Sequence, residues 1–557
     1  MMMMTIGNTE LVQRSRFRFC QYVSFPAKTC FFLVTCLYRH ILLRVHPLWI
    51  QICYFMSLSF LGFGLLKLIK PRTTTHDSSS NNLDLFFTSV SASTVSSMST
   101  VEMEVFSQPQ LIVMTILMLI GGEVFTSMVG LFFIRLKLKT HQDKVATSST
   151  SIPTVTSILD PVELETIEVG VETDHIKPDS DHNRPQSVKE PSSNDESSYD
   201  NGGYLGYNSV KYLGFVVLGY QIVVQVIGTV MVYIYVSTVS SAKQVLRKKG
   251  LKFFTFSVFT VVSTFASCGF VPTNENMIVF AKNSGLLIML IPQVLLGNTL
   301  YPCFLRFSIW VVGKFVKKEE SLYLLRNPQE VGYKHLLAKE YSRFLLVTVV
   351  GFIVVQFIVF CSLDWNSVAL EGLRWHEKVW GIMFQCVNSR HTGESIVDLS
   401  VLSPAILVLF VVMMYLPPYT SFLPVKKEGK NGEGNSDQRR RKRRGILVEN
   451  IVMSQLSYLV IFIIMICITE RKQLKQDPLN FNVLNIVIEV ISAYGNVGFS
   501  MGYSCERRIK MEGYCVDNST GFVGWWSPQG KIILIIVMLF GRLKKFNMDG
   551  GQAWILL

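Results

Sequence analysis

Long apolar segments alternate with shorter ones along most of this chain of 557 residues. Membrane-spanning helices need about 20 predominantly apolar residues to cross a bilayer, and most of the long segments approach or exceed that length. They cover residues 48–68, 111–136, 212–236, 286–316, 344–361, 401–416, 452–468 and, in a last, shorter segment, 532–540. We therefore expect an all-α membrane protein.

A shorter apolar segment lies between the two members of each pair of long ones. These shorter segments cover residues 83–96, 252–268, 378–388 and 484–496. Each is too short to span a bilayer and ends at a turn containing Gly or Ser, as a half-crossing pore helix does. Non-helical backbone survives at that depth only where protein or a water-filled cavity surrounds it. The alternative is that they are four buried amphipathic connectors.

The same pattern divides the chain into four units, each with the order span, pore helix, turn, span. The units cover residues 46–139, 207–318, 340–424 and 446–546. Around them we expect a cytoplasmic N-terminal tail (1–45), an acidic cytoplasmic loop (140–206), a cytoplasmic linker (319–339), a basic cytoplasmic loop (425–445) and a C-terminal tail (547–557). The predicted fold has four M1–pore-loop–M2 units around a single pore, with eight transmembrane helices and four pore helices. The acidic loop is rich in Ser, Thr, Pro and Asn, which predicts disorder.

Charged residues make up 17% of the chain, and the formal net charge is +13. An excess of basic residues is also found in nucleic-acid-binding proteins, but here the basic residues cluster at the ends of spans. The clusters lie at residues 135–139, 314–318, 426–444 and 542–545. Positive residues near span ends mark the cytoplasmic side of a membrane. If each unit starts and ends inside, all four clusters lie on one face, so we expect both termini in the cytoplasm, lipid bilayer as a partner and no nucleic acid.

The turns after the four pore helices are centred on small residues: Ser97, Gly269, Gly393 and Gly498. A monovalent cation that crosses lipid must exchange its water shell for oxygens, which rings of backbone carbonyls provide. Glycine tolerates backbone angles that other residues avoid, and without a side chain it lets four segments approach one axis. A preceding helix also points its partly negative C-terminal end at the cavity. This pattern predicts an ion selectivity filter.

Polar residues follow the first two turns at equivalent places, where we expect the outer mouth. Superposing the turns places Glu102 on Asn274 and Glu104 on Asn276. Glu102, Glu104 and Glu275 would raise the local cation concentration there; the alternative for Glu104 and Glu275 is that they are solvated loop charges. By contrast, Gly62, Gly64, Gly121 and Gly122 lie inside spans and are interpreted as packing residues.

The outer loop of the fourth unit contains three candidates for covalent modification. Cys505 and Cys515 are two of the 11 cysteines and are candidates for a disulfide. Asn518 begins an Asn-Ser-Thr sequence, a candidate glycosylation site. The chain contains no recognisable catalytic constellation, so we expect neither an enzyme nor a cofactor, and no metal beyond a transported ion.

The pore-loop sequences resemble those of a known family. Residues 84–91 and 95–106 closely resemble the first pore loop of plant HKT transporters, relatives of the bacterial and fungal Trk and Ktr potassium uptake proteins. The other three pore loops are similar at residues 263–276, 387–394 and 494–502, and residues 541–546 resemble the C-terminal signature of the family. The resemblance covers roughly residues 46–545; the N-terminal tail and the length of the acidic loop do not match.

This resemblance assigns roles to individual residues. It implies that Ser97, Gly269, Gly393 and Gly498 are the filter positions, and serine at the first of them resembles the sodium-selective subfamily. Asn274 matches a position where asparagine accompanies sodium preference in some relatives. A basic residue near the end of the last span is thought to face the permeation path, and Arg542 is the best match; the alternative is cytoplasmic anchoring. Relatives outside plants are dimeric, which favours a homodimer.

The resulting expectation is a plasma-membrane transporter that conducts Na+ like a channel, passively into cells, and contributes to Na+ homeostasis and salt tolerance. A K+ transporter or Na+/K+ symporter is the alternative within the same class. The alternative from another class is a non-conducting receptor or scaffold that uses the acidic loop.

Overall fold

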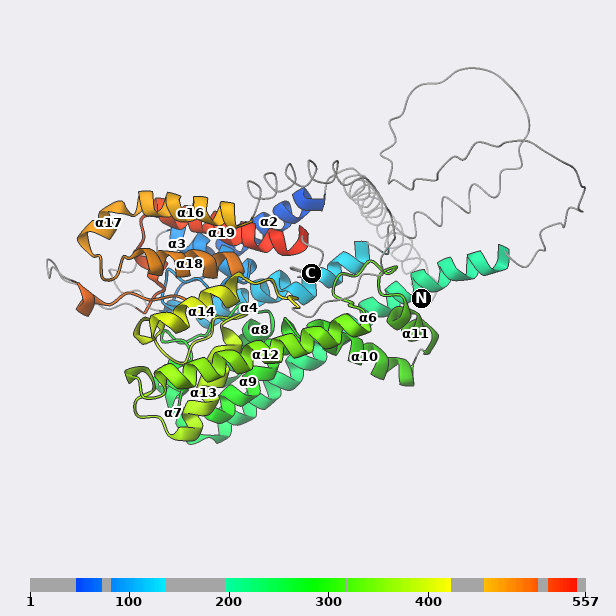
Figure 1. Ribbon diagram of the computed structural model, residues 1–557, viewed down its shortest axis with the longest axis horizontal. Helices are drawn as coiled ribbons and strands as arrows, with labels where there is room; N and C mark the ends of the chain where they lie inside the picture. Colours follow the sequence, from blue (N-terminus) through cyan, green and yellow to red (C-terminus); the bar gives the residue numbers. More distant parts are fainter. Residues whose placement is uncertain are drawn as a thin grey trace, which may run out of the picture. The chain divides into compact units, whose positions relative to one another are not determined.

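The computed structural model describes residues 47–72, 82–133, 135, 196–316, 318–421, 455–508 and 519–547. The predicted N-terminal tail and basic loop, and most of the acidic loop and the C-terminal tail, lie outside these residues. Within the described residues every regular element is a helix (Figure 1). The prediction of an all-α protein is confirmed.

Contacts divide the chain into two compact units. The larger comprises the chain up to residue 127, residues 217–307 and residues from 334 onward, and it holds all four predicted pore helices. The smaller comprises residues 128–216 and 308–333. In the smaller unit the Ser321 hydroxyl, on α11 (Lys318–Arg326), donates to the Ile309 carbonyl at 2.8 Å. The four loops that follow the pore helices belong to the larger unit.

Each quarter of the chain has the predicted order of M1 helix, pore helix and M2 helix. The helices are α2 (Pro47–Leu68), α3 (Asn82–Ser93) and α4 (Gln108–Gly121); α6 (Glu196–Thr238), α8 (Phe253–Phe265) and α9 (Ser284–Gly297); α12 (Lys339–Asp364), α13 (Trp375–Asn388) and α14 (Pro404–Tyr415); and α16 (Gln455–Thr469), α18 (Val483–Gly495) and α19 (Pro528–Asn547). The pattern did not predict α7 (Ser240–Lys248), α11 and α17 (Arg471–Gln476). Helix α6 also begins inside the segment expected to be disordered.

The four quarters close into a ring. Each pore helix packs against the M2 helix of the preceding quarter: α8 against α4, α13 against α9, α18 against α14, and α3 against α19. The pore helices α3, α8 and α18 also contact the M2 helices of their own quarters, α4, α9 and α19. The last contact, between α3 and α19, joins the first quarter to the fourth and so closes the cycle. The four loops that follow the pore helices are thereby brought to one centre.

Glycines in three M2 helices allow this close packing. A Cβ atom added at Gly121, Gly297 or Gly541 would overlap the backbone carbonyl oxygen of the residue near the end of the same quarter's pore helix. The interpretation of Gly121 as a packing residue is confirmed. It is wrong for Gly64, because nothing lies within 4 Å of a Cβ added there.

Two M2 segments are bent, which the sequence pattern did not predict. The first turns by 51° between α4 and the helix Glu123–Phe133, and the second by 83° between α9 and α10 (Tyr301–Phe315). At the second break the Asn298 side chain donates to the Ser267 hydroxyl at 3.0 Å, and Pro302 starts the new helix. The prediction of one continuous span over 286–316 is therefore wrong.

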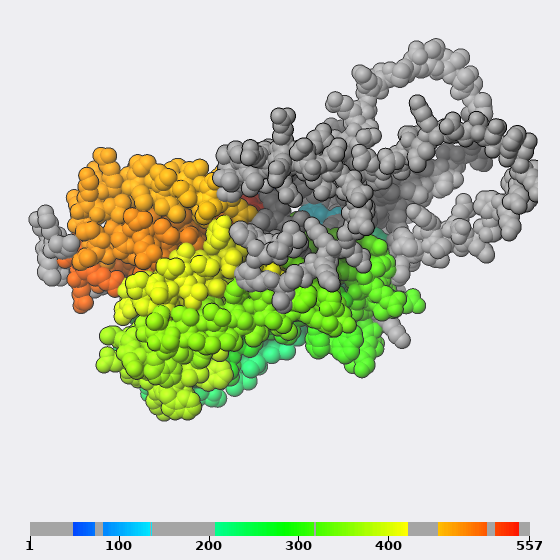
Figure 2. All heavy atoms as spheres, in the orientation of Figure 1, coloured from blue at the N-terminus to red at the C-terminus, as the bar shows by residue number. Residues whose placement is uncertain are grey.

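The membrane-spanning capacity of the described helices agrees with a multi-span protein. By length and composition, three helices suffice to cross a bilayer, within α2, α6 and α12, or up to five if each bent pair is one span. Helix α12 runs across the face shown in Figures 1 and 2, and its exposed side chains include Val347, Val355 and Ile358. Such an apolar face suits contact with lipid. The count of eight spans stays a prediction.

Candidate functional site

The four predicted filter residues all have positive backbone φ angles. The φ angle is 53° at Ser97, 89° at Gly269, 64° at Gly393 and 103° at Gly498. All four therefore lie in the left-handed region, which glycine adopts readily and other residues adopt at a cost. Ser97 therefore has a backbone φ angle in the region that glycine favours, as the glycines at the centres of the other three turns do.

The loops leave the pore helices in closely similar ways. In three of them the amide before the filter residue donates to the carbonyl five residues earlier: Ser96 to Ser91 at 2.8 Å, Cys268 to Ser263 at 2.8 Å and Val497 to Ser492 at 3.0 Å. The third loop differs by one residue, because Gly393 itself donates to the Asn388 carbonyl at 3.2 Å. A repeated loop geometry after each pore helix is what a pore with near four-fold symmetry requires.

The four predicted filter residues also lie close to the neighbouring loops. A Cβ atom added at Gly269 would overlap the Thr392 carbonyl oxygen, and one added at Gly393 would lie 2.5 Å from the Val497 carbonyl oxygen. A Cβ atom added at Gly498 would overlap the Cβ atom of Ser97, whose Oγ would also lie 3.4 Å from a Cβ at Gly269. The loops of all four quarters thus meet, and there is no room for side chains at the three glycines.

Two fully buried carboxylates, which the sequence analysis did not single out, lie beside the loops. Glu394 follows Gly393 and accepts a hydrogen bond from the Thr264 hydroxyl of α8 at 2.5 Å. Glu489 of α18 accepts from the Ser500 hydroxyl at 3.0 Å. An ionisable residue inside a membrane segment is by itself a signal of function, and that signal was present in both pore-loop sequences.

Arg542 lies inside the protein and is only 1% exposed. Its guanidinium donates to the Gly121 carbonyl at the bend after α4 and lies 5.7 Å from the centre of the Phe55 ring. This burial argues against a simple cytoplasmic anchor, which would keep its charge in water or among lipid headgroups, and the role of Arg542 stays a prediction.

A second buried arginine was not predicted. Arg390, in the third pore loop, donates to the carbonyls of Pro417 and Pro418 at 2.5 and 3.3 Å, where the backbone leaves α14. The next residue, His391, bonds the Thr299 hydroxyl at the break after α9 at 3.0 Å. Asn298, Arg390, Pro417, Tyr494, Gly541 and Lys544 line a cavity on this side of the loops. The third loop is thus tied to the break after α9 and to the backbone that follows α14.

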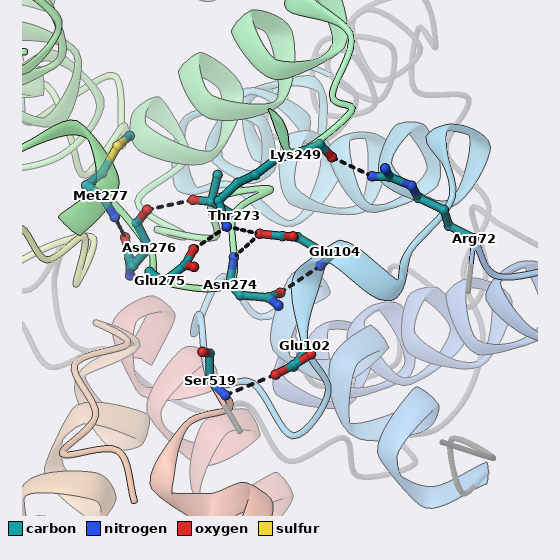
Figure 3. Close-up of polar contacts among 10 residues, drawn as sticks. All are labelled: Arg72, Glu102, Glu104, Lys249, Thr273, Asn274, Glu275, Asn276, Met277 and Ser519. Carbon is teal, nitrogen blue, oxygen red and sulfur yellow. Dashed lines mark hydrogen bonds and ion pairs between the residues drawn. The ribbon is translucent and has the colours of Figure 1, made fainter. Parts of the chain in front are cut away.

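The predicted outer-mouth residues form a polar cluster (Figure 3). Asn274 accepts a hydrogen bond from the Glu104 amide at 2.9 Å, and its own amide donates to the Glu104 carboxylate at 3.1 Å. Glu102 accepts from the Ser519 amide at 3.1 Å. These contacts join the first pore loop to the second and the fourth.

Glu104 and Glu275 are not isolated loop charges, although the side chain of Glu275 is 43% exposed. Both carboxylates pair with the ammonium of Lys249, which the sequence analysis did not consider. Partial burial acts to lower the pKa of Lys249, but hydrogen bonds and charge from Glu104 and Glu275 raise it above its ordinary value. The ammonium therefore stays charged and cancels one of the two negative charges, so the mouth attracts cations less than the sequence suggested.

The remaining candidates lie at the edge of the described residues. Cys505 is disulfide-bonded, whereas Cys515 and the glycosylation candidate Asn518 lie outside the described residues.

Comparison with known proteins gives consistent matches. The profile of the TrkH family, described as a cation transport protein, matches residues 194–548. The chain is 48% identical to "Cation transporter HKT1;3" of Oryza sativa subsp. japonica, over 91% of each chain. It is 49% identical to "Sodium transporter HKT1" of Arabidopsis thaliana, over 88% of this chain and 91% of that one. The crystal structure of the potassium transporter TrkH from Vibrio parahaemolyticus matches with a TM-score of 0.47 and 12% identity, covering 90% of this chain and 83% of that one.

Proposed function

This chain belongs to the TrkH/HKT family of cation transporters, and we propose that it is a sodium-selective member that conducts Na+ passively, like a channel, into cells. We place it in the plasma membrane with both termini in the cytoplasm, where it contributes to Na+ homeostasis and salt tolerance. Its relative in Arabidopsis thaliana carries the name of a sodium transporter.

The observation that carries the proposal is the side chain of Ser97 at the junction of the pore loops. Its Oγ would lie 3.0 Å from a Cβ at Gly498 and 3.4 Å from one at Gly269. A ring of backbone carbonyls selects an ion by its size and by the number and field strength of the dipoles around it. One hydroxymethyl group among three glycines narrows the ring on one side and breaks its symmetry. The resemblance to plant HKT transporters indicates that serine at this position favours Na+ over K+.

Asn274 also supports selectivity for Na+. Its side-chain oxygen accepts a hydrogen bond from the Glu104 amide, a role that a neutral amide fills without adding charge. An aspartate there would place a third carboxylate beside Glu104 and Glu275. The positive charge that pairs with these two carboxylates is that of Lys249. The mouth would then attract cations more strongly and with less discrimination.

Voltage clamp of oocytes that express the protein tests the proposal. We expect the reversal potential to shift by about 59 mV for each tenfold change in external Na+, the value for a monovalent ion, and to move little with external K+. An equal shift with K+ would instead support a K+ transporter or a Na+/K+ symporter. Normal surface expression without current would support a receptor or scaffold.

Arg542 is proposed to act as a barrier to permeation. Its buried positive charge would oppose the passage of cations beneath the filter, since a charge in a low-dielectric interior acts strongly over short distances. Replacing Arg542 by glutamine should therefore increase inward Na+ current severalfold at equal surface expression and weaken rectification. Current–voltage curves from the same oocyte assay measure both effects.

The matched control for this charge is Arg542→Lys, which keeps the positive charge but alters the hydrogen bond to Gly121. It should retain the rectification of the wild type. A loss of current that is equal in Arg542→Gln and Arg542→Lys would show that the residue acts only in packing.

A further inference from the structure

Lys249 is held in place by its backbone as well as by its side chain. It lies between α7 and α8, where the chain turns at Gly250 with φ of 61°. The Arg72 guanidinium donates to the Lys249 carbonyl at 2.9 Å, and the Arg72 amide donates to the Val105 carbonyl at 2.8 Å. Arg72 thus fixes the turn that carries Lys249 to the first pore loop (Figure 3).

The ammonium of Lys249 lies between two carboxylates from different quarters. It pairs with Glu104 after the first filter loop and with Glu275, at 2.5 Å, after the second. The side chains of Lys249, Glu104 and Glu275 are 15%, 25% and 43% exposed, so ions from solution reach the carboxylates while the ammonium is largely covered. A free cation at the same place would find the same two ligands.

The carboxylate of Glu104 does not depend on Lys249 for its position. The reciprocal hydrogen bonds with Asn274, of 2.9 and 3.1 Å, hold the backbone and the side chain of Glu104 against the second loop. Glu275 is the next residue after Asn274. Removal of the ammonium would therefore leave both carboxylates near their present positions with a combined charge of two.

We propose that Lys249 is a specificity-determining residue: its tethered ammonium occupies a cation-binding position between Glu104 and Glu275 and so keeps divalent cations out of the outer mouth. A tethered group competes at a high effective concentration, because its binding is intramolecular. Calcium and magnesium favour carboxylate oxygens, whereas a monovalent cation binds them more weakly. The inference rests on the proposed function, because the mouth matters only if cations enter there.

The test is external calcium in the oocyte clamp with the full-length protein. Wild-type Na+ current should change little when external Ca2+ is raised to about 10 mM, whereas the current of Lys249→Met should fall at least about twofold, as expected for an extracellular site of millimolar affinity. Calcium sensitivity that is the same in both proteins would overturn the proposal. Absence of Na+ current in the wild type would instead contradict the proposed function.

Two controls separate occupation of the site from a general effect of charge. Lys248 is exposed and adjacent in sequence, so Lys248→Met removes the same charge without opening the site and should stay insensitive to calcium. The double variant Lys249→Met/Glu275→Gln should lose the acquired block, because one of the two ligands is gone. Equal block in Lys248→Met, or persistence of block in the double variant, would contradict the proposal.

A second variant makes the test independent of the folding of the first. Lys249→Cys should be blocked by calcium, and treatment with methanethiosulfonate ethylammonium, which attaches an ammonium through a disulfide, should relieve the block in the same cell. The wild type treated with the reagent controls for reaction at other cysteines. Calcium block that the attached ammonium leaves unchanged would show that a positive charge at this position does not exclude divalent ions.

Discussion

Replacement of Gly269 by alanine should reduce Na+ current by more than about tenfold at unchanged surface expression. Alanine in the left-handed conformation costs about 1–2 kcal/mol, and its Cβ atom would overlap the Thr392 carbonyl oxygen. The overlap is with backbone of the adjacent loop, which cannot rotate away as a side chain would. The second and third loops must therefore separate, and the carbonyl ring loses its geometry. Clamp currents normalised to surface biotinylation measure the effect.

Two other glycines of the chain separate the causes of this loss. Gly502 has φ of 63° but nothing within 4 Å of an added Cβ atom, so Gly502→Ala reports backbone strain alone. Gly64→Ala, in α2, has neither strain nor overlap and should conduct like the wild type. If Gly269→Ala conducts as well as Gly64→Ala, the second loop is not part of the filter.

The four-fold pattern was predictable because length and polarity constrain a membrane chain strongly. An apolar segment that cannot span the bilayer, placed between two that can, has few structures open to it. The pore helices α3, α8, α13 and α18 accordingly lie at or close to the predicted segments. The small residues at the centres of the four turns were predictable for a related reason, since a turn that approaches three others needs the smallest residues available.

Pairing between charges was not predictable, because it depends on which loops meet. Glu104 and Lys249 are far apart in the sequence and come together only because α7 returns the chain to the first quarter. A partial signal existed: two acids near one mouth need a counter-ion, and basic residues cluster just before α8. Arg390 left a clearer signal, since a positive charge inside a pore turn is costly unless it is paired.

The interruptions of the M2 segments were missed because mean hydropathy is insensitive to a single break. Residues 286–316 are apolar almost throughout, yet Asn298 and Pro302 end one helix and begin another. Proline fits the first turn of a helix but weakens a helix interior, although α9 holds Pro292 inside it. The pair Pro417–Pro418 follows the end of α14 for the same reason. Weighting Asn298 and Pro302 as a break would have placed the end of α9, whereas the predicted segment 401–416 already ends within one residue of the end of α14.

Replacement of Ser97 by glycine should add K+ permeability, so that the reversal potential shifts with external K+ as well as with Na+, by up to about 59 mV per tenfold change. The variant should fold normally, because Ser97 already has φ of 53°, where glycine is the less strained residue. The change removes only the hydroxymethyl group that lies against Gly498 and Gly269. Four glycines would then give a more symmetric and wider ring, which suits the larger ion.

Ser97→Ala separates the two parts of this side chain. It keeps the Cβ atom, which lies against Gly498, and removes the Oγ that approaches both neighbouring loops. If the width of the ring sets selectivity, Ser97→Ala should stay selective for Na+ and only Ser97→Gly should conduct K+. If the hydroxyl acts as a ligand for Na+, both variants should lose selectivity. An unchanged response to K+ in Ser97→Gly, with normal Na+ current, would reject Ser97 as the determinant and place selectivity elsewhere along the pore.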